Sequence, residues 1–378
     1  MPKEAKKAPS VQPAPSAPLL LHIFHSFGAG GSQTRLVRLI DHFGARFRHA
    51  VVALDNNYSS LSRVTARSQV TPFPVAPVHG TLAKWRRYSE VLGRLRPHRL
   101  VTHNWGTMDW GIANMSAGMR HVHIEDGFGP DEVVRQKRRR VATRNMVLRR
   151  SAIVVPSMTL VTIAERIWKL PRKRIHYVPN GVDCARFAPS GGERKSNAAF
   201  VIGTVAALRP EKRIDRLIGA FAAARFEMPS RLVIVGDGPE RKKLESLAGE
   251  LGLGARVMFV GQQLDTAPFY KTFDVFALSS DTEQMPYTII EAMASGCSIA
   301  ATDVGDIRKM VSAGNMEFVV PKAENDMANA LGKLASDSAL RHSLGLANRG
   351  KACLEYDESL MFDAFGELFG VENPAGVA

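Results

Sequence analysis

Two carboxylates, those of Glu283 and Glu291, lie on either side of a predicted helix start, with seven residues between them. Carboxylates at this spacing can bind one ligand together. An apolar run predicts a strand that ends before Ser279, and the loop after it carries Glu283. Pro286 suits the first turn of the next helix, which contains Glu291 and ends at Gly296. Carboxylates on either side of a helix N-terminus can each bind vicinal hydroxyls, while the amides between them face an anion. A sugar joined to a nucleotide by a diphosphate has this pattern. A helix with an acidic first turn and one exposed glutamate also fits, and taken alone it is the simpler interpretation.

A glycine turn near the N-terminus is a second candidate. Gly28 and Gly30 follow a predicted strand, and Asp55 ends the next one, as in a dinucleotide fold, but Gln33 stands where that fingerprint has its third glycine. A tight turn that needs the permissive backbone of Gly30 and Gly31 explains the glycines equally well. In either case the helix that follows can present its amides to a phosphate.

Short apolar runs that alternate with amphipathic stretches predict the elements that position these residues. The helix after the glycine turn is capped by Ser32 and ends at Gly44, and further helices are predicted at 239–251 and 286–295. Continuous Val, Ile and Ala runs separated by helices indicate parallel strands that are buried on both faces. The predicted strands cover residues 19–25, 49–55, 99–104, 121–125, 152–156, 175–179, 200–206, 231–235, 256–260, 275–278, 298–301 and 318–320.

The polar, Gly- and Ser-rich stretch at 188–198 has no periodicity and predicts a linker between two domains. The expected fold class is α/β, with two Rossmann-like domains whose parallel sheets face each other across a cleft and bind a ligand at the carboxyl ends of the strands. The predicted divisions are a disordered tail at 1–18, a first domain at 19–187, the linker, a second domain at 199–354, and at 355–378 a helix that crosses back to the first domain, then a tail.

The composition, with 378 residues of which 45% are apolar and 23% charged, is that of a soluble two-domain globular protein. Three cysteines are too few for a disulfide framework or a zinc cluster, so we expect reduced thiols in the cytosol. No apolar run approaches the ~20 residues that span a bilayer. The N-terminal segment lacks the apolar stretch of a secretory signal.

The net charge of +14 is unevenly distributed. Residues 1–189 hold 30 Lys and Arg against 11 Asp and Glu, a balance of +19, whereas the remainder holds 20 against 25, a balance of −5. Such asymmetry indicates that one half meets an anionic surface or ligand, and both nucleic acid and an acidic membrane are candidates. No nucleic-acid module is recognisable, and the basic residues are not interleaved with stacking aromatics, so a nucleic-acid partner is not expected.

Seven motifs in order make the chain resemble the retaining glycosyltransferases of family 4, which have the two-domain GT-B fold. The resemblance runs from about Leu20 to Phe369. The motifs are Gly30-Gly31, Val178-Pro179-Asn180-Gly181-Val182-Asp183, Leu208-Arg209-Pro210-Glu211-Lys212, Val235-Gly236-Asp237-Gly238-Pro239, Phe259-Val260-Gly261, the Glu283 and Glu291 pair with Ala292-Met293-Ala294, and Thr302-Asp303-Val304-Gly305.

The resemblance implies a role for each matching residue. Glu283 contacts the donor sugar, Glu291 contacts the ribose, and Lys212 neutralises the diphosphate. The donor-binding residues are expected to be Gly30, Gly31, Arg209, Lys212, Gln284, Met285, Pro286, Tyr287, Thr288 and Glu291. The chain contains no Asp-x-Asp pair, so we expect no metal, and lysine and backbone amides stabilise the departing nucleotide. No cofactor is expected beyond the co-substrate, a nucleoside diphosphate sugar, for which UDP is favoured by family frequency.

Some positions depart from the family pattern. Ala207 stands where the family has an arginine in its phosphate segment, and Arg209 reaches the same face if the strand continues through Leu208. Further departures are Gln284, Asp306 and Lys309. In the first domain, the family's active-site histidine corresponds either to His123, which we favour as the catalytic residue, or to Asp126. A histidine packed in a strand is the structural alternative.

The expected activity is the transfer of a hexose-type unit from a nucleoside diphosphate sugar, with retention of configuration, to a lipid-linked or other anionic saccharide. A nucleotide-sugar epimerase of the same architecture is the alternative. The basic stretch Arg135–Arg150 forms either a solvated helix face or a site of reversible docking to the inner face of the membrane, so we expect a cytoplasmic, peripheral protein. Trp105 either contacts the acceptor or, more simply, packs in the core.

Overall fold

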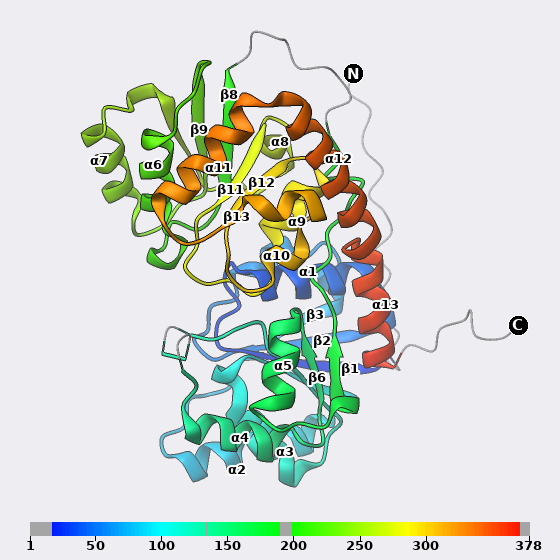
Figure 1. The fold of residues 1–378 in the computed structure, drawn as a ribbon. Helices are drawn as coiled ribbons and strands as arrows, with labels where there is room; N and C mark the ends of the chain where they lie inside the picture. Colours follow the sequence, from blue (N-terminus) through cyan, green and yellow to red (C-terminus); the bar gives the residue numbers. More distant parts are fainter. Residues whose placement is uncertain (1–16, 130, 133–134, 190–198, 371–378) are drawn as a thin grey trace, which may run out of the picture. The chain divides into compact units, whose positions relative to one another are not determined.

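The computed structural model describes residues 17–129, 131–132, 135–189 and 199–370, and these form two compact units (Figure 1). Unit 1 comprises Met1–Val178 and Phe362–Ala378, and unit 2 comprises Pro179–Met361. Nearly all of the predicted N-terminal tail, most of the predicted linker and the C-terminal tail lie outside the described residues.

Unit 1 is built on a seven-stranded parallel sheet in the order β3-β2-β1-β4-β5-β6-β7. The strands are β1 (Leu19–Phe24), β2 (Arg48–Ala53), β3 (Val70–Pro72), β4 (Arg99–His103), β5 (His121–Ile124), β6 (Ala152–Val155) and β7 (Ile175–Tyr177). The apolar runs predicted all of these except β3. That strand was missed because it is a short edge strand that ends at a proline and exposes two of its three residues.

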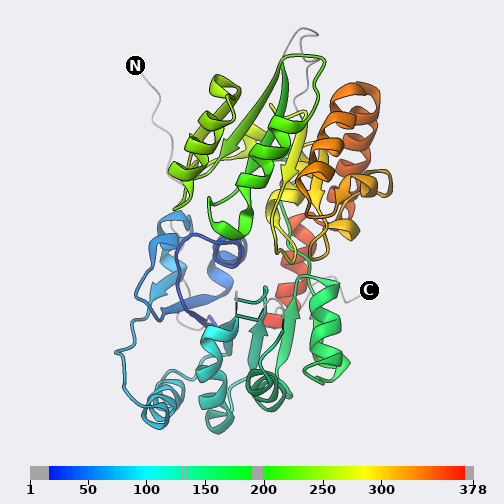
Figure 2. The ribbon, with the colours of Figure 1, turned by 60° about the vertical axis from the view of Figure 1, so that its left-hand side comes forward.

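The helices of unit 1 cover both faces of this sheet. α1 packs its apolar stripe on one face, with Leu36 and Ile40 against Phe24, while α2 and α3 pack on the other face through residues such as Leu92 and Trp110. Figure 2 shows α2 to α5, coloured cyan to green, following one another across the unit. The helices are α1 (Gly31–Phe43), α2 (Thr81–Leu95), α3 (Met108–Ala117), α4 (Arg138–Leu148), α5 (Met158–Arg166) and α13 (Glu358–Phe369).

The start of α1 differs from the prediction. The helix begins at Gly31 with Gly30 in the N-cap position, and the hydroxyl of Ser32, the predicted cap, donates to Gln33 Oε1 at 3.0 Å. Gly30 has a φ of 175°, which is extended backbone open to any residue, so the turn needs no left-handed glycine there. A Cβ at Gly30 would lie 2.4 Å from Gln33 Oε1, and a Cβ at Gly28 would lie 2.9 Å from Asn57 Nδ2, so a larger residue at either position requires a neighbouring side chain to move.

Unit 2 is built on a six-stranded parallel sheet in the order β10-β9-β8-β11-β12-β13. The strands are β8 (Phe200–Val205), β9 (Ser230–Val235), β10 (Val257–Gly261), β11 (Val275–Leu278), β12 (Ser298–Thr302) and β13 (Val319–Val320). The helices are α6 (Ile214–Ala223), α7 (Arg241–Glu250), α8 (Ala267–Tyr270), α9 (Tyr287–Ala294), α10 (Ile307–Met310), α11 (Glu324–Ser336) and α12 (Ser338–Glu355). The prediction of two Rossmann-like parallel sheets is confirmed.

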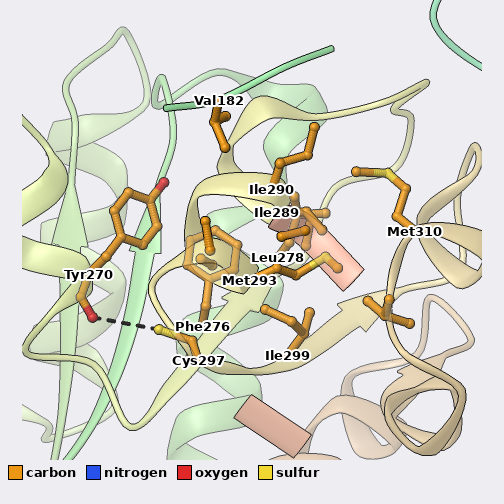
Figure 3. Packing of buried hydrophobic residues seen from close by; sticks show 14 of the residues in the cluster. Val182, Tyr270, Phe276, Leu278, Ile289, Ile290, Met293, Cys297, Ile299 and Met310 are labelled. Carbon is orange, nitrogen blue, oxygen red and sulfur yellow. Dashed lines mark hydrogen bonds between the residues drawn. The ribbon is translucent and has the colours of Figure 1, made fainter. Parts of the chain in front are cut away.

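Helix α9 is anchored firmly in unit 2. Figure 3 shows Ile289, Ile290 and Met293 of α9 gathered against Phe276 of β11 and Ile299 of β12. All five side chains are fully buried. Because each buried aliphatic or aromatic side chain contributes about 1.5–3 kcal/mol, this packing fixes the helix that follows the Glu283 loop.

The boundary between the units differs from the predicted one. Residues 179–187, which the sequence analysis gives to the first domain, belong to unit 2. The reason is a short pairing with the end of α12: Val182 N donates to Tyr356 O, and Glu358 N donates to Val182 O, both at 2.9 Å. The division at Met361 and Phe362 lies within α13, so this one helix contributes residues to both units.

Candidate active site

The loop between β11 and α9 holds Glu283 as a partly buried hydrogen-bond acceptor. Its Oε1 accepts from Lys212 Nζ at 2.6 Å and from Ser280 Oγ at 2.8 Å. The Glu283 side chain is 11% exposed, and that of Lys212 is 26% exposed. The fold therefore brings together a carboxylate and an ammonium group from positions 71 residues apart, and both keep some access to solvent.

Backbone contacts fix the shape of the Glu283 loop. Gly305 has a φ of +58°, and a Cβ on it would lie 2.3 Å from the carbonyl oxygen of Glu283, so only glycine fits beneath the loop. Asp306 N donates to Gln284 O at 3.1 Å. On the other side of the loop, Asn180 Nδ2 donates to Met285 O at 2.7 Å. The turn at 302–306, which contains the sequence motif at 302–305, and the motif at 178–183 thus hold this loop.

Lys212 ends a short 3-10 turn, Pro210–Lys212, that is tied to the same loop. Ser279 Oγ donates to the carbonyl oxygen of Lys212 at 3.0 Å, and Asp281 N donates to Glu211 O at 2.9 Å. Arg213, which follows, has a φ of 48°, an uncommon conformation for a residue other than glycine. The backbone that carries Lys212 is therefore bonded directly to the loop that carries Glu283.

Asp281 links two arginines beside this pair. Its carboxylate accepts from Arg216 Nη2 at 2.6 Å and from Arg213 Nη1 at 3.2 Å. Burial alone would raise the pKa of Asp281, but the hydrogen bonds from Arg216 and Arg213 outweigh it and lower the pKa below its usual value. Asp281 is therefore ionised at neutral pH, and it keeps both guanidinium groups in place.

Glu291 lies in α9 and accepts a hydrogen bond from a buried tyrosine. Tyr270 Oη donates to Glu291 Oε2 at 2.8 Å. Burial, and next the charge of Glu291, raise the pKa of Tyr270 well above its usual value, so the phenol stays protonated and remains a donor. Tyr270 thus helps to orient the Glu291 carboxylate, and a carboxylate can accept several hydrogen bonds.

The other predicted donor-binding residues lie around this loop. The Gln284 and Met285 carbonyls are the acceptors described above, Pro286 precedes α9, and Tyr287 and Thr288 form its first turn. Arg209 is different, because β8 ends at Val205 and the strand does not continue through Leu208 as the period-two argument requires. Arg209 is nonetheless exposed, and no described side chain holds its guanidinium.

Of the two candidates in unit 1, Asp126 is accessible and His123 is not. His123 is 0% exposed within β5, and its Nδ1 lies 2.8 Å from Thr102 Oγ1. Asp126 follows β5, and its side chain is 21% exposed and paired with Arg35. The exposure favours Asp126 for direct contact with a ligand. The predicted residues Gly30 and Gly31 lie at the start of α1, where Gln33 Nε2 bonds the Ser26 carbonyl at 2.8 Å.

Two models of known protein families match this chain, one in each half. The family model described as Glycosyl transferases group 1 matches residues 191–351, and the one described as Glycosyltransferase Family 4 matches residues 29–186. Together these stretches include the Glu283 and Glu291 motif and the glycine turn.

The chain therefore carries two domains that glycosyltransferase family models match, one in each half.

Similar glycosyltransferases cover different parts of the chain. A GDP-mannose-dependent alpha-mannosyltransferase of Mycobacterium tuberculosis is 35% identical over 158 residues, which span 40% of this chain and 39% of that protein. A D-inositol 3-phosphate glycosyltransferase of Nocardia farcinica is 26% identical over 303 residues, 71% of this chain and 66% of that protein. The chain thus spans less than two thirds of the length of either relative.

Solved structures share the fold over nearly the whole chain. The crystal structure of Anabaena Alr3699/HepE in complex with UDP and glucose has a TM-score of 0.79 at 18% identity, and covers 94% of this chain and 100% of that one. WaaG, a glycosyltransferase involved in lipopolysaccharide biosynthesis, has a TM-score of 0.69 at 17% identity, covering 93% and 100%.

The sequence did not predict some of the buried charged residues of unit 1. In unit 1, Arg144 of α4 is 0% exposed and pairs with Glu132 at 3.1 Å and with Glu125 at 3.4 Å. Its guanidinium lies 4.9 Å from the ring centroid of Trp105, which is half-buried, so this tryptophan packs against the cluster. A basic run in the sequence does not distinguish an arginine that is buried with carboxylates from one that faces solvent.

Two kinds of feature are absent from the described part of the chain. Among those residues there is no group of three or more His, Cys, Asp or Glu that could hold a metal ion. No helix in the same residues is both long and apolar enough to span a membrane.

Proposed function

We propose that this chain transfers a sugar from a nucleoside diphosphate sugar to an acceptor, with retention of configuration at the anomeric carbon. The observation that carries the proposal is the 2.6 Å contact between Lys212 and Glu283 at the positions of the family motifs. A donor brings a diphosphate for the ammonium group and sugar hydroxyls for the carboxylate, so each partner of this pair has a matching group on the ligand. The names of the relatives, which are sugar transferases, support the same reading.

Each site residue has a stated role in this proposal. Lys212 neutralises the diphosphate, and the amides at the start of α9 add hydrogen bonds to it, which stabilises the charge that grows on the departing nucleotide. Glu283 accepts from hydroxyls of the transferred sugar. Glu291, oriented by Tyr270, accepts from the ribose hydroxyls.

UDP is the favoured nucleotide, because a structural neighbour was solved with UDP and glucose, although a relative is named for GDP-mannose. A thermal-shift screen of UDP-, GDP-, ADP- and CMP-sugars tests this choice. A donor at 100 times its dissociation constant stabilises the protein by ~2.7 kcal/mol. A shift with UDP-sugars alone supports the proposal, whereas no shift with any nucleotide sugar contradicts it.

The reaction is proposed to need no metal, because Lys212 supplies positive charge at the diphosphate and the sequence has no Asp-x-Asp pair. Turnover is then expected to be unchanged by EDTA. Activity that EDTA abolishes and magnesium or manganese restores would overturn this part of the proposal. Retention is tested by the anomeric coupling constant of the product in proton NMR.

The acceptor is proposed to be anionic, and a lipid-linked saccharide fits best, because residues 1–189 carry a balance of +19. The structure changes which residues of the basic stretch can meet it. Arg140 bonds Glu132 and Asp131, both at 2.9 Å, and Arg144 is fully buried, so neither faces an external partner. Arg138 and Arg139, at the start of α4, are exposed.

Sedimentation with vesicles tests this contact. The wild type is expected to bind vesicles that contain phosphatidylglycerol at low salt and to dissociate as salt is raised. Replacing Arg138 and Arg139 with Gln should lower binding, whereas the same change at Lys242 and Lys243, exposed residues of α7 in unit 2, should not. A wild type that ignores these vesicles would leave a soluble anionic acceptor as the partner.

The epimerase alternative predicts a different product. An epimerase converts one nucleotide sugar into another and releases no nucleotide, whereas a transferase releases one nucleoside diphosphate for each sugar moved. Mass spectrometry of the reaction mixture separates the two. Since the relatives named above are transferases, we favour release of the nucleotide.

A further inference from the structure

Cys184 and Cys353 lie side by side in unit 2, although they are far apart in the sequence. Cys184 belongs to the segment at 179–187 that pairs with the end of α12, and Cys353 lies in the last turn of that helix. The hydrogen-bond partners of the Cys184 thiol are the Cys353 thiol and the Asp357 carboxylate. The fold of unit 2 therefore brings the two sulfur atoms next to each other.

Contacts before and after Cys353 hold Cys184 opposite it. Arg349 lies one turn before Cys353 on the same face of α12. Its Nη1 donates to the carbonyl oxygen of Phe187 at 3.2 Å and to that of Cys184 at 3.5 Å. Beyond the end of the helix, the Asp357 carboxylate accepts from the backbone N–H of Cys184. The backbone of Cys184 is thus held at both of its polar groups.

The two thiols differ in their access to solvent. Cys184 is 6% exposed and belongs to the apolar core of unit 2, whereas Cys353 packs at the margin of that core and is partly exposed. Burial, and next the hydrogen bond with Cys353, raise the pKa of Cys184, so it stays a protonated thiol at neutral pH. An oxidant that comes from solvent therefore meets Cys353 first, with Cys184 behind it. An accessible cysteine beside a second one is typical of redox-sensitive pairs.

We propose that Cys184 and Cys353 form a reversible disulfide when the protein meets a peroxide. First, the Cys353 sulfur attacks hydrogen peroxide and the O–O bond breaks, which oxidises the thiol to a sulfenic acid and releases one water. Next, the Cys184 sulfur attacks the sulfenic sulfur and the S–O bond breaks. The hydroxyl leaves with the Cys184 proton as a second water. Two thiols and one hydrogen peroxide thus give one disulfide and two waters.

The disulfide joins the segment at 179–187 covalently to α12. Asn180 of this segment donates to Met285 O in the Glu283 loop, so the cross-link fastens one of the supports of that loop. Because a cross-link restricts the unfolded chain, the oxidised protein should unfold at a higher urea concentration than the reduced protein. Neither the cross-link nor this shift requires transfer activity.

Thiol counting on the full chain tests the disulfide. The protein is treated with hydrogen peroxide, then unfolded in urea with N-ethylmaleimide, and the number of labels is read by mass spectrometry. The reduced wild type offers three thiols, and the oxidised wild type should offer only Cys297. A peptide that joins Cys184 to Cys353 should appear, and dithiothreitol should remove it and restore all three thiols.

The unfolded chain is the control for proximity. When peroxide is added to protein that is already unfolded in urea, the same cross-linked peptide should form more slowly, on the order of 10-fold or more, because a long loop must then close. An equal rate in both states would show that the fold does not bring the two sulfurs together.

Variants identify the pair. Cys353→Ala, a change at a partly exposed position, should form no cross-linked peptide and show no rise of the urea midpoint after peroxide. Cys184→Ala should behave in the same way, and if it fails to fold, Cys353→Ala still decides. Cys297→Ala is the matched control. Its thiol donates to Tyr270 O at 3.5 Å (Figure 3), so this variant should keep both the cross-link and the rise.

The proposal is overturned if peroxide leaves all three thiols reactive, or if it converts Cys353 to a sulfinic acid without the cross-linked peptide. A disulfide that contains Cys297, or one that joins two chains on a non-reducing gel, would overturn it as well. Failure of the proposed sugar transfer is read separately, from the donor screen.

Discussion

At the scale of single residues, the two glutamates of the motif have different partners, so we expect substitutions of the two to impair different steps. Glu283 pairs with Lys212, and Glu291 pairs with Tyr270. Glu283→Gln should lower transfer on the order of 100-fold while UDP affinity changes less than about threefold, because its partner is the sugar. Glu291→Gln should lower UDP affinity about 10-fold, because its partner is ribose. Calorimetry with UDP and initial rates separate the two, and identical behaviour would contradict the division of roles.

Lys212 and Arg209 are the cations proposed to meet the diphosphate. Lys212→Met should lower UDP affinity on the order of 10-fold or more, because a charge-assisted hydrogen bond is lost. Arg209→Ala should lower UDP affinity several-fold if the exposed guanidinium of Arg209 reaches the same phosphates. The measurement is the dissociation constant for UDP at two salt concentrations. A neutral result for Arg209→Ala would leave the role to Lys212 alone, and a neutral result for Lys212→Met would contradict the proposed site.

Sequence reasoning reached some of these residues and not others. Glu283 and Lys212 were predicted because each lies in a recognisable motif, but their contact joins positions 71 residues apart and could not be derived from spacing. Arg35 and Asp126 are 91 residues apart and neither spacing nor charge pattern links them. The burial of His123 could not be predicted either, because the sequence around a histidine in an apolar strand does not indicate whether its ring is exposed.

At the scale of elements, the Glu283 loop depends on a glycine beneath it. Gly305→Ala combines the strain of a positive φ with a Cβ 2.3 Å from the Glu283 carbonyl oxygen. Gly252→Ala is the matched control, since its φ is +64° but no atom lies within 4 Å of a Cβ there. The control should cost about 1–2 kcal/mol of unfolding free energy and no activity.

Gly305→Ala should cost more stability than the control and lower kcat/KM at least 10-fold, because the carboxylate is displaced. Urea unfolding and initial rates measure both variants side by side. Equal losses of stability with unchanged activity in both would show that the turn at 302–306 does not position the loop.

The elements themselves were largely predictable, because parallel strands buried on both faces leave continuous apolar runs. The failures have local causes. β3 is an exposed edge strand that carries no such run. The cap of α1 was misplaced by two residues, because Gly30 occupies the N-cap position and the Ser32 hydroxyl bonds Gln33 rather than the helix backbone. The basic stretch that contains α4 was expected to present its arginines to solvent or to a membrane. In the structure, Arg140 and Arg144 are instead paired with carboxylates of the same unit.

At the scale of the whole molecule, the two units should respond differently to acid. Burial lowers the pKa of His49 to about 3 and those of His22 and His103 well below their usual value, and burial together with His123 lowers that of His121 to about 3. Unit 2 contains only His342, which is exposed.

Since the unfolded chain takes up protons below pH ~6.5 and the buried rings do not, the unfolding free energy of unit 1 should fall as pH drops from ~6.5 toward 3, by up to ~1.4 kcal/mol per pH unit for each such histidine. The four tryptophans, Trp85, Trp105, Trp110 and Trp168, all lie in unit 1, so their fluorescence reports this unit in urea titrations. A midpoint that does not decrease between pH 7 and pH 5 would contradict the prediction.

The central claim is that a sugar leaves a nucleoside diphosphate and is joined to an acceptor at the site that contains Lys212 and Glu283. The most direct test supplies a UDP-sugar with a ¹³C-labelled sugar, together with a lipid and saccharide extract of the producing cells, and follows the label by mass spectrometry. We predict equal amounts of free UDP and of a labelled product one sugar heavier than its acceptor, with both reduced on the order of 100-fold in Glu283→Gln. Label that reappears only in another nucleotide sugar, with no UDP released, would contradict the account.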